Sequence, residues 1–266
     1  MQITCVQLDI ELGDIQRNSQ KVKEYIIEAA EKGSQIVVLP ELWTTGYCLP
    51  KIADLIDDHQ QIVNDLQDLA KKYAITIVAG SIPTKENEKI FNTLFVISKE
   101  GETIKEYSKV HLFKLMNEHH YLASGNEDGM FELGNTKATG VICYDLRFPE
   151  WFRLHAVNGA EIFFVVAEWP LSRIEQWKVM LQSRAIENQS FVIGCNRVGK
   201  DESTTFGGHS LIVDPYGNIL AEGGENEELI TAAVSMPLVS KARGFIPILT
   251  DRQPEVYELF QSQMTK

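Results

Sequence analysis

Short apolar runs recur along the whole chain and predict β-strands. Two of them, residues 36–39 and 162–166, are apolar at every position, which is typical of strands covered on both faces. The pattern therefore predicts sheets that lie between other layers. The predicted strands comprise residues 3–8, 36–39, 75–80, 92–98, 139–143, 161–167, 191–195 and 209–213.

Helical spacing appears between several of these strands. Val22, Ile26 and Ala29 recur at intervals of three and four residues, and Gly33 is placed to end that helix. Residues 62–73 form a second helical pattern. A third pattern follows Ser172, which we expect to be its N-cap. Its recurring positions are Trp177, Met180, Leu181, Arg184, Ala185 and Asn188.

Two predicted turns, at residues 99–101 and 215–218, join strands into hairpins. Hairpins mixed with alternating strands and helices predict an α/β protein with mixed sheets, and they argue against an all-parallel Rossmann sheet or a TIM barrel. No GxGxxG follows the first strand, so a dinucleotide cofactor has no support. Because no linker or repeat divides the chain, we expect one domain over residues 1–266.

The formal charge of −12 narrows the classes of partner. A mean field this negative repels phosphates, so we expect neither nucleic-acid nor membrane binding. No secretory signal is recognisable in residues 1–10, and no apolar run approaches the roughly 18 residues of a membrane span. We therefore expect a cytoplasmic protein, in which thiols stay reduced. The cysteines expected to be free are Cys5, Cys48, Cys143 and Cys195.

Glu41 follows the predicted strand at residues 36–39, a position where α/β proteins often carry catalytic groups. Aromatic and small residues come next, among them Trp43, Gly46 and Tyr47. Partial desolvation among such neighbours would raise the pKa of the carboxyl group and suit it to general-base catalysis. A solvated loop carboxylate is the ordinary alternative.

Cys143 ends the predicted strand at residues 139–143, and a turn then leads through Pro149 into a helix. Such a turn would present the sulfur at the end of the sheet and direct backbone N–H groups to the same point. A helix N-terminus and a nearby lysine would both favour the thiolate. The alternative is an inert buried thiol, which is how we interpret Cys5 and Cys195.

Lys109 begins a segment of alternating apolar and polar positions, which alone is a weak signal. Three segments taken together resemble the nitrilase superfamily of carbon–nitrogen hydrolases: LPELWTTGY around Glu41, SKVHLF around Lys109 and CYDLRFPE around Cys143. The resemblance covers nearly the whole chain. It implies a four-layer α-β-β-α sandwich with two mixed sheets. It also implies Glu41 as general base, Lys109 as oxyanion partner and Cys143 as nucleophile.

Further similarity points to the omega-amidase branch, whose members hydrolyse the terminal amide of 2-oxo acids such as 2-oxoglutaramate. Residues 169–177 and 185–199 carry this similarity, and Glu118 falls where the superfamily has a second glutamate near the site. The resemblance implies that Glu118 orients Lys109 or the substrate. It also implies that the backbone N–H of Tyr144 contributes to the oxyanion hole, with Tyr47 and Trp169 as candidate pocket walls.

Two residues, Glu168 and Arg147, leave undecided whether the substrate is anionic. Glu168 stands in a Glu-Trp-Pro sequence where many members have Asn-Trp-Pro. A carboxylate at this position would disfavour an anionic substrate if it faces the pocket, but not if it points away. Arg147 follows Cys143 by four residues and has three interpretations: a pair with Glu150, a contact near Glu41, or a ligand of a substrate carboxylate.

The predicted activity is that of a cysteine amidase that cleaves a small non-peptide amide through a thioester and releases ammonia. We expect no cofactor, no metal, and a homodimer or higher homo-oligomer. One alternative is an N-carbamoyl amino acid or carbamoyl-amine hydrolase with the same three catalytic residues. Another is an inactive binding or scaffold protein. A papain-like protease is disfavoured, because the chain has no Cys–His–Asn arrangement with the local signature of that family. The histidines without a metal-ligand pattern are His111, His119, His120 and His155.

Overall fold

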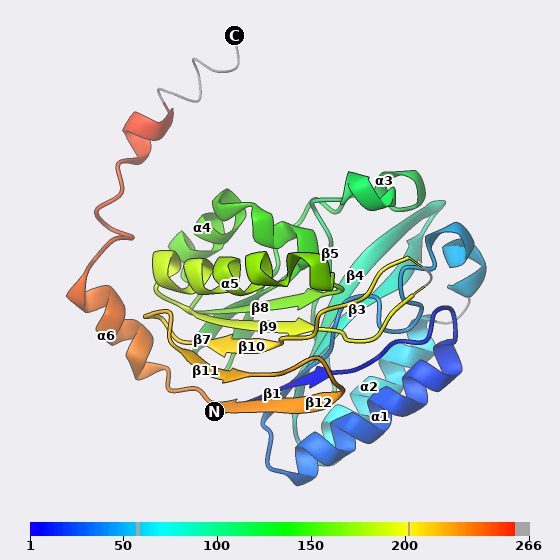
Figure 1. Cartoon of the computed structure of the whole chain (residues 1–266). Coiled ribbons are helices and arrows are strands. Elements are labelled where there is room, and N and C mark those ends of the chain that lie inside the picture. The colour runs from blue at the N-terminus through cyan, green and yellow to red at the C-terminus, as the bar shows by residue number, and fades with distance from the viewer. Residues whose placement is uncertain (57–58, 202, 259–266) are drawn as a thin grey trace.

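The computed structural model describes residues 1–56, 59–201 and 203–258, and within them two six-stranded sheets are stacked face to face. Helices α1 (Ile15–Glu31) and α2 (His59–Tyr73) cover the outer face of one sheet. Helices α4 (Pro149–Val157) and α5 (Ile174–Asn188) cover the other, as Figure 1 shows. The predicted four-layer α-β-β-α sandwich with two mixed sheets is therefore confirmed.

The first sheet has the strand order β12-β1-β2-β3-β4-β5. Its three central strands β1, β2 and β3 are parallel, and the remaining pairs are antiparallel. The predicted turn at residues 99–101 joins β4 to β5 in a hairpin. The bounds are β1 (Gln2–Gln7), β2 (Ile36–Val38), β3 (Thr76–Glu86), β4 (Lys89–Ile97), β5 (Thr103–Ser108) and β12 (Glu228–Ala233).

The second sheet has the order β11-β10-β9-β8-β7-β6, again with three parallel strands, β7, β8 and β9, inside it. The predicted turn at residues 215–218 joins β10 to β11. The bounds are β6 (Met130–Leu133), β7 (Thr136–Ile142), β8 (Ile162–Ala167), β9 (Phe191–Asn196), β10 (Leu211–Val213) and β11 (Ile219–Glu222).

Alternation along the inner strands explains the layering. In β1, Ile3 and Cys5 pack between the two sheets, whereas Val6 packs beneath helices α1 and α2. Neighbouring β2 does the same, with Val38 between the sheets and Val37 under the helices. Successive side chains point to opposite faces of a strand, so a strand covered on both faces is apolar at most of its positions.

The helix ends agree with most of the predictions. Gly33 follows α1 with φ +88°, a left-handed conformation that glycine adopts at little cost. The predicted cap Ser172 is wrong, because Arg173 is the N-cap of α5 and no side chain caps that end.

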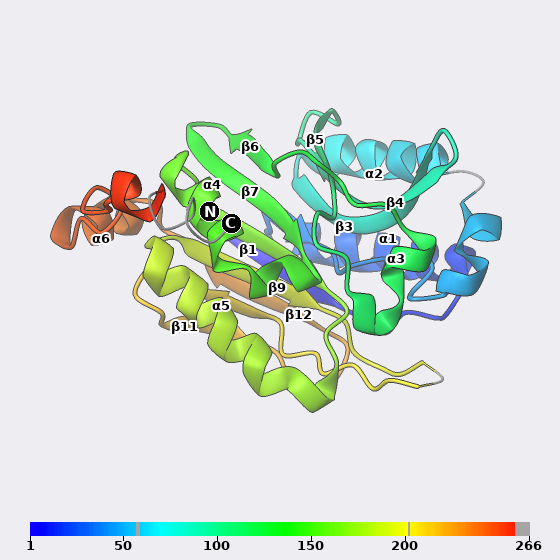
Figure 2. The same cartoon turned by 90° about the horizontal axis from the view of Figure 1, so that it is seen from above.

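Helix α6 (Pro237–Phe245) lies outside the sandwich, as Figures 1 and 2 show. The short helices are α3 (Glu118–Tyr121), η1 (Leu49–Leu55), η2 (Lys114–Met116), η3 (Cys143–Arg147) and η4 (Leu171–Arg173).

None of the helices in the described part of the chain combines the length and apolar character needed to cross a bilayer.

Candidate active site

The backbone around Glu41 is fixed where β2 gives way to a loop. The N–H of Ser81 donates to the carbonyl oxygen of Pro40 (3.2 Å), which ties the loop to β3. Gly80 makes this approach possible, because it has φ +60° and a Cβ there would lie 2.0 Å from the Pro40 oxygen. Only glycine tolerates both the conformation and the contact. The position of Glu41 therefore depends on a neighbouring strand of the same sheet.

The carboxylate of Glu41 is fully buried and is hydrogen-bonded through both of its oxygens. Its Oε1 accepts from Lys109 Nζ (2.8 Å), Asn92 Nδ2 (2.8 Å) and Tyr47 Oη (2.9 Å). Its Oε2 accepts from the backbone N–H of Glu168 (3.0 Å). The aromatic surroundings expected for Glu41 are therefore only part of its environment, because hydrogen-bond donors also surround the carboxylate. A dry carboxylate with this many donors is held in one orientation.

Lys109 directly follows β5, is fully buried and lies between two carboxylates. Its Nζ is 2.8 Å from Oε1 of Glu41 and 2.7 Å from Oε1 of Glu118. Burial alone would lower the pKa of Lys109, but the charges of Glu118 and Glu41 outweigh burial and raise the pKa well above its ordinary value. Lys109 is therefore a permanent cation in this site.

Glu118 opens helix α3 and is completely buried, which excludes a solvated loop position for this glutamate. Besides Lys109, it accepts from Tyr47 Oη (2.6 Å) and from the backbone N–H of Phe113 (2.7 Å). Burial, together with the charges of Glu118 and Glu41, raises the pKa of Tyr47 well above its ordinary value. Tyr47 consequently remains a protonated donor between two carboxylates, in addition to its predicted place in the pocket wall.

Cys143 stands immediately beyond β7, in the second sheet, with φ +44°. This left-handed conformation is uncommon for a residue other than glycine and is typical of functional sites. The side chain is 7% exposed, and the charge of Glu41 acts on its thiol. The strand-to-turn geometry predicted for Cys143 is confirmed, and the turn leads through η3 into α4 with Pro149 at its first position.

The expectation of a stabilised thiolate is wrong. Burial, followed by the charge of Glu41, raises the pKa of the Cys143 thiol well above its ordinary value, and the opposing effect of Lys109 is smaller. The reason is that Lys109 already faces two carboxylates, so the net field at the sulfur is not positive. In the free protein the sulfur is therefore a thiol, and a base must remove its proton during the reaction.

A buried carboxylate behind the nucleophile holds its unusual backbone. Asp145 Oδ2 accepts from the N–H of Ile142 (2.9 Å) and from Tyr107 Oη (2.8 Å). Its Oδ1 accepts from the N–H of His111 (3.2 Å) and lies 2.7 Å from His111 Nδ1. These four contacts link the turn at Cys143 to the chain that leaves β5. Sequence analysis missed Asp145, although its place two residues after the nucleophile was a usable signal.

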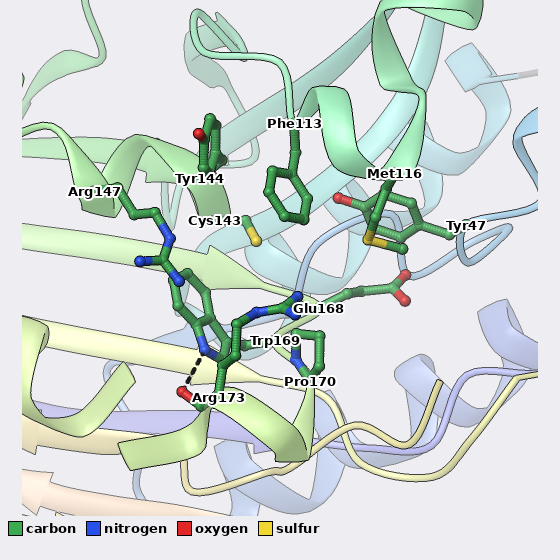
Figure 3. A pocket seen from close by; sticks show the side chains of 10 residues that line it. All are labelled: Tyr47, Phe113, Met116, Cys143, Tyr144, Arg147, Glu168, Trp169, Pro170 and Arg173. Atoms are coloured by element: carbon green, nitrogen blue, oxygen red, sulfur yellow. Dashed lines mark hydrogen bonds between the residues drawn. The ribbon is translucent and has the colours of Figure 1, made fainter. Parts of the chain in front are cut away.

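The pocket in front of the sulfur is small and has a mostly apolar surface. Figure 3 shows the side chains that line it. Tyr47 and Trp169 both line it, which agrees with the prediction for each. Tyr144 contributes its ring to the wall, while the expected role of its backbone N–H is left as a proposal. The residues around the pocket are Tyr47, Phe113, Met116, Cys143, Tyr144, Arg147, Glu168, Trp169, Pro170 and Arg173.

Glu168 follows β8, and its carboxylate points away from the Cys143 sulfur in Figure 3. Oε2 pairs with Nη1 of Arg197 (2.9 Å), whose Nη2 also contacts Oδ1 of Asp9 (3.0 Å). Burial raises the pKa of Glu168 to about 8, and the charge of Arg197 opposes that shift. The replacement of the more usual Asn is thus matched by a buried arginine, which sequence analysis did not anticipate.

Arg147 also lines the pocket, but it forms neither of the two pairs that we considered. Its Nη2 donates to Oε1 of Gln176 (2.7 Å), and its guanidinium lies over the ring of Trp169 (4.9 Å to the centroid). The expected contacts with Glu150 and with the surroundings of Glu41 are therefore wrong.

No group of three or more His, Cys, Asp or Glu side chains in the described ranges is arranged to hold a metal ion. The other cysteines differ from Cys143 in their surroundings. Cys5 and Cys195 are fully buried between the sheets, as predicted, and the Cys195 thiol donates to the carbonyl of Val38 (3.3 Å). Cys48 lies partly exposed before η1.

A fold of two mixed sheets with Glu41, Lys109 and Cys143 meeting at their strand ends is typical of carbon–nitrogen hydrolases. The family model for carbon-nitrogen hydrolases matches residues 2–244. The chain therefore belongs to the carbon–nitrogen hydrolase family, in the omega-amidase-like branch of the nitrilase superfamily, and is a cysteine-dependent amidohydrolase.

Named relatives cover almost the whole chain. A 2-oxoglutaramate amidase of Bacillus subtilis is 46% identical over 96% of this chain and 98% of its own. A hydrolase of the agr operon in Staphylococcus aureus is 38% identical over 97% and 100%. Among solved structures, Saccharomyces cerevisiae Nit3, a member of branch 10 of the nitrilase superfamily, superposes with a TM-score of 0.87 at 30% identity. That match covers 96% of each chain.

Proposed function

We propose that this enzyme hydrolyses the terminal amide of a 2-oxo acid of the 2-oxoglutaramate type to the dicarboxylate and ammonia. The observation that carries the proposal is the meeting of the Cys143 thiol with a buried Glu41, whose charge acts on the thiol and whose carboxylate contacts Lys109. Near-full-length similarity to a 2-oxoglutaramate amidase supports the substrate class. The small pocket fits a short linear amide better than a peptide.

In the first half-reaction, Glu41 takes the proton of the Cys143 thiol as the sulfur attacks the amide carbon. Negative charge then develops on the carbonyl oxygen, where Lys109 Nζ and the backbone N–H of Tyr144 stabilise it. Two N–H groups of Lys109 are directed at Glu41 and Glu118, and the third makes only a 3.3 Å contact with Tyr47. This third donor is the one that can turn toward the substrate.

When the tetrahedral intermediate collapses, the C–N bond breaks and the protonated Glu41 gives its proton to the departing nitrogen. Ammonia leaves, and the acyl group remains on Cys143 as a thioester. Water then enters, and Glu41 removes its proton as the oxygen attacks the thioester carbon. The C–S bond breaks, and the proton held by Glu41 returns to the sulfur, so that one base serves both half-reactions.

A substrate panel tests this function. The wild-type enzyme and Cys143→Ala are incubated with 2-oxoglutaramate and with a carbamoyl amino acid, and ammonia and carbon dioxide are measured. We expect ammonia from 2-oxoglutaramate with the wild type only, and no carbon dioxide. Carbon dioxide and ammonia from the carbamoyl amino acid alone would replace this proposal by a carbamoyl hydrolase. No turnover of any amide would support a binding protein.

We also propose that the enzyme is a homodimer paired through its outer helices. Helices α4 and α5 expose apolar side chains that include Leu154, Val179 and Ile186, the last two 62% and 52% exposed. A second copy would remove this apolar surface from water. Light scattering should give twice the chain mass, and Val179→Glu with Ile186→Glu should halve it. A wild-type monomer would contradict the proposal.

Two simpler expectations accompany this function: residues 1–266 form one domain, and the enzyme works in the cytoplasm. Limited proteolysis should leave one resistant core, and cell fractionation should recover the enzyme with cytoplasmic markers. Two stable fragments, or recovery in another fraction, would contradict the corresponding expectation.

A further inference from the structure

A 2-oxo acid brings a permanent negative charge into a site that already holds three buried acidic side chains, Glu41, Glu118 and Glu168. The two buried cations nearby are already engaged. Lys109 pairs with Glu41 and Glu118, while Arg197 pairs with Glu168 and Asp9. A substrate carboxylate in this dry, acidic surrounding needs a further cation that lacks an acidic partner.

Arg173 is such a cation. It ends η4, is partly buried and lines the pocket together with Cys143. Figure 3 shows its side chain extending into the pocket. Among the described residues, its guanidinium makes no hydrogen bond or ion pair. The guanidinium lies over the ring of Phe113, with 5.7 Å between its carbon atom and the ring centroid.

The backbone of Arg173 is fixed although its guanidinium is free. Its N–H donates to the carbonyl of Pro170 (3.0 Å), and its carbonyl accepts from Nε1 of Trp169 (2.9 Å). Trp169 and Pro170 line the same pocket. The side chain is thus anchored at its base, while its tip has no partner among the described residues that a ligand would have to displace.

Arg147, the other arginine of the pocket, is less available. Its guanidinium already donates to Gln176 and rests on Trp169. It contributes positive potential, but a ligand would compete with these contacts. The two arginines differ in this respect although both lack an acidic partner among the described residues.

We propose that Arg173 binds the carboxylate of the 2-oxo acid substrate and so selects it over neutral amides. The inference rests on the proposed function. A guanidinium presents two parallel N–H donors that match the two oxygens of a carboxylate. The amide carbon then lies at the Cys143 sulfur while the opposite end of the substrate is held at Arg173. Arg173 is therefore a specificity residue, and the chemistry belongs to Glu41, Lys109 and Cys143.

The test compares Arg173→Gln, Arg173→Lys and the control Lys114→Gln, which removes one exposed positive charge from neighbouring η2. Steady-state kinetics are measured with 2-oxoglutaramate and with butyramide, which has no carboxylate. Loss of a charge-assisted hydrogen bond should raise KM for 2-oxoglutaramate roughly 10- to 100-fold in Arg173→Gln. Arg173→Lys should fall between it and the wild type. Lys114→Gln, and the hydrolysis of butyramide by all variants, should change less than about twofold.

A second readout does not require turnover. In the Cys143→Ala background, calorimetry should show that Arg173→Gln weakens 2-oxoglutaramate binding by a similar factor, while Lys114→Gln does not. Unchanged affinity and KM, or equal losses with both amides, would overturn the role of Arg173. Absence of 2-oxoglutaramate hydrolysis by the wild type would instead overturn the proposed function, so the two failures are distinguishable.

Discussion

Nζ of Lys109 lies 2.7 Å from Oε1 of Glu118, and neither side chain is accessible to solvent. Glu118 is fixed independently, because its other oxygen accepts the backbone N–H of Phe113. The carboxylate therefore determines where the ammonium group sits and compensates its charge. We infer that Glu118 is a positioning residue that acts through Lys109.

Glu118→Gln should lower kcat with 2-oxoglutaramate by roughly 10²- to 10³-fold, because a misplaced Lys109 stabilises the oxyanion poorly. KM should change little, since Glu118 does not bind the ground-state substrate. The control is Glu150→Gln, an exposed glutamate in the first turn of α4, which should retain kcat. A change confined to KM would contradict the positioning role.

The thiol pKa of Cys143 should fall when Glu41 is replaced by Gln. Burial is the largest cause of the raised pKa and remains in the variant, but the charge of Glu41 is the second cause and disappears. Lys109 then acts on the sulfur with one carboxylate fewer to offset it. The ultraviolet absorbance of the thiolate, followed against pH and corrected with Cys143→Ala, measures this shift. An unchanged or higher pKa in Glu41→Gln would show that the carboxylate does not face the sulfur.

Asp145→Asn should disturb the turn that presents the nucleophile. An amide nitrogen would replace one oxygen and meet donors such as the N–H of Ile142 or the hydroxyl of Tyr107. A buried donor facing a donor should reduce the free energy of unfolding by about 1–3 kcal/mol. We expect kcat to fall roughly 10- to 100-fold as the sulfur shifts. Chemical denaturation and kinetics measure the two effects, and a stable variant with wild-type kcat would contradict the account.

The buried Glu168 makes stability depend on pH in a defined direction. Its pKa is raised from 4.5 to about 8 on folding, so the folded chain holds the proton over a range in which the unfolded chain has released it. The free energy of unfolding should therefore fall as pH rises from about 4.5 to about 8.

Glu168→Gln, which cannot ionise, isolates this effect. Its stability relative to the wild type should increase with pH across the same window and then level off above it. Urea denaturation at several pH values measures the difference. A constant difference across the window, or one of opposite slope, would mean that Glu168 stays ionised against Arg197.

The inner layers of the fold could be predicted from the sequence, whereas the sheet edges could not. Runs such as residues 36–39 and 162–166 are apolar because they are covered on both faces. Strands β6 and β12 escaped prediction, and β5 and β11 were implied only by the hairpin turns that precede them. These four strands form the edges of the two sheets. Edge strands are half exposed and carry charges, as Lys105 and Glu106 do in β5, so their apolar pattern is weak.

The site shows the same limit. Glu41, Lys109 and Cys143 could be named because each stands at a strand end within a recognisable motif. Asn92, a partner of Glu41, and Arg197, the partner of Glu168, could not be named, since a hydrogen bond between residues distant in sequence leaves no local pattern. The prediction of a Cys143 thiolate was wrong for a related reason. A nearby lysine favours a thiolate only if its charge is not already neutralised by two carboxylates.

The most direct measurement is mass spectrometry of the wild-type enzyme quenched rapidly during turnover of 2-oxoglutaramate. We expect an acyl adduct on the peptide that contains Cys143, with the mass of the substrate less ammonia, formed and lost at the catalytic rate. Turnover without that adduct, or with the acyl group on another residue, would contradict this expectation.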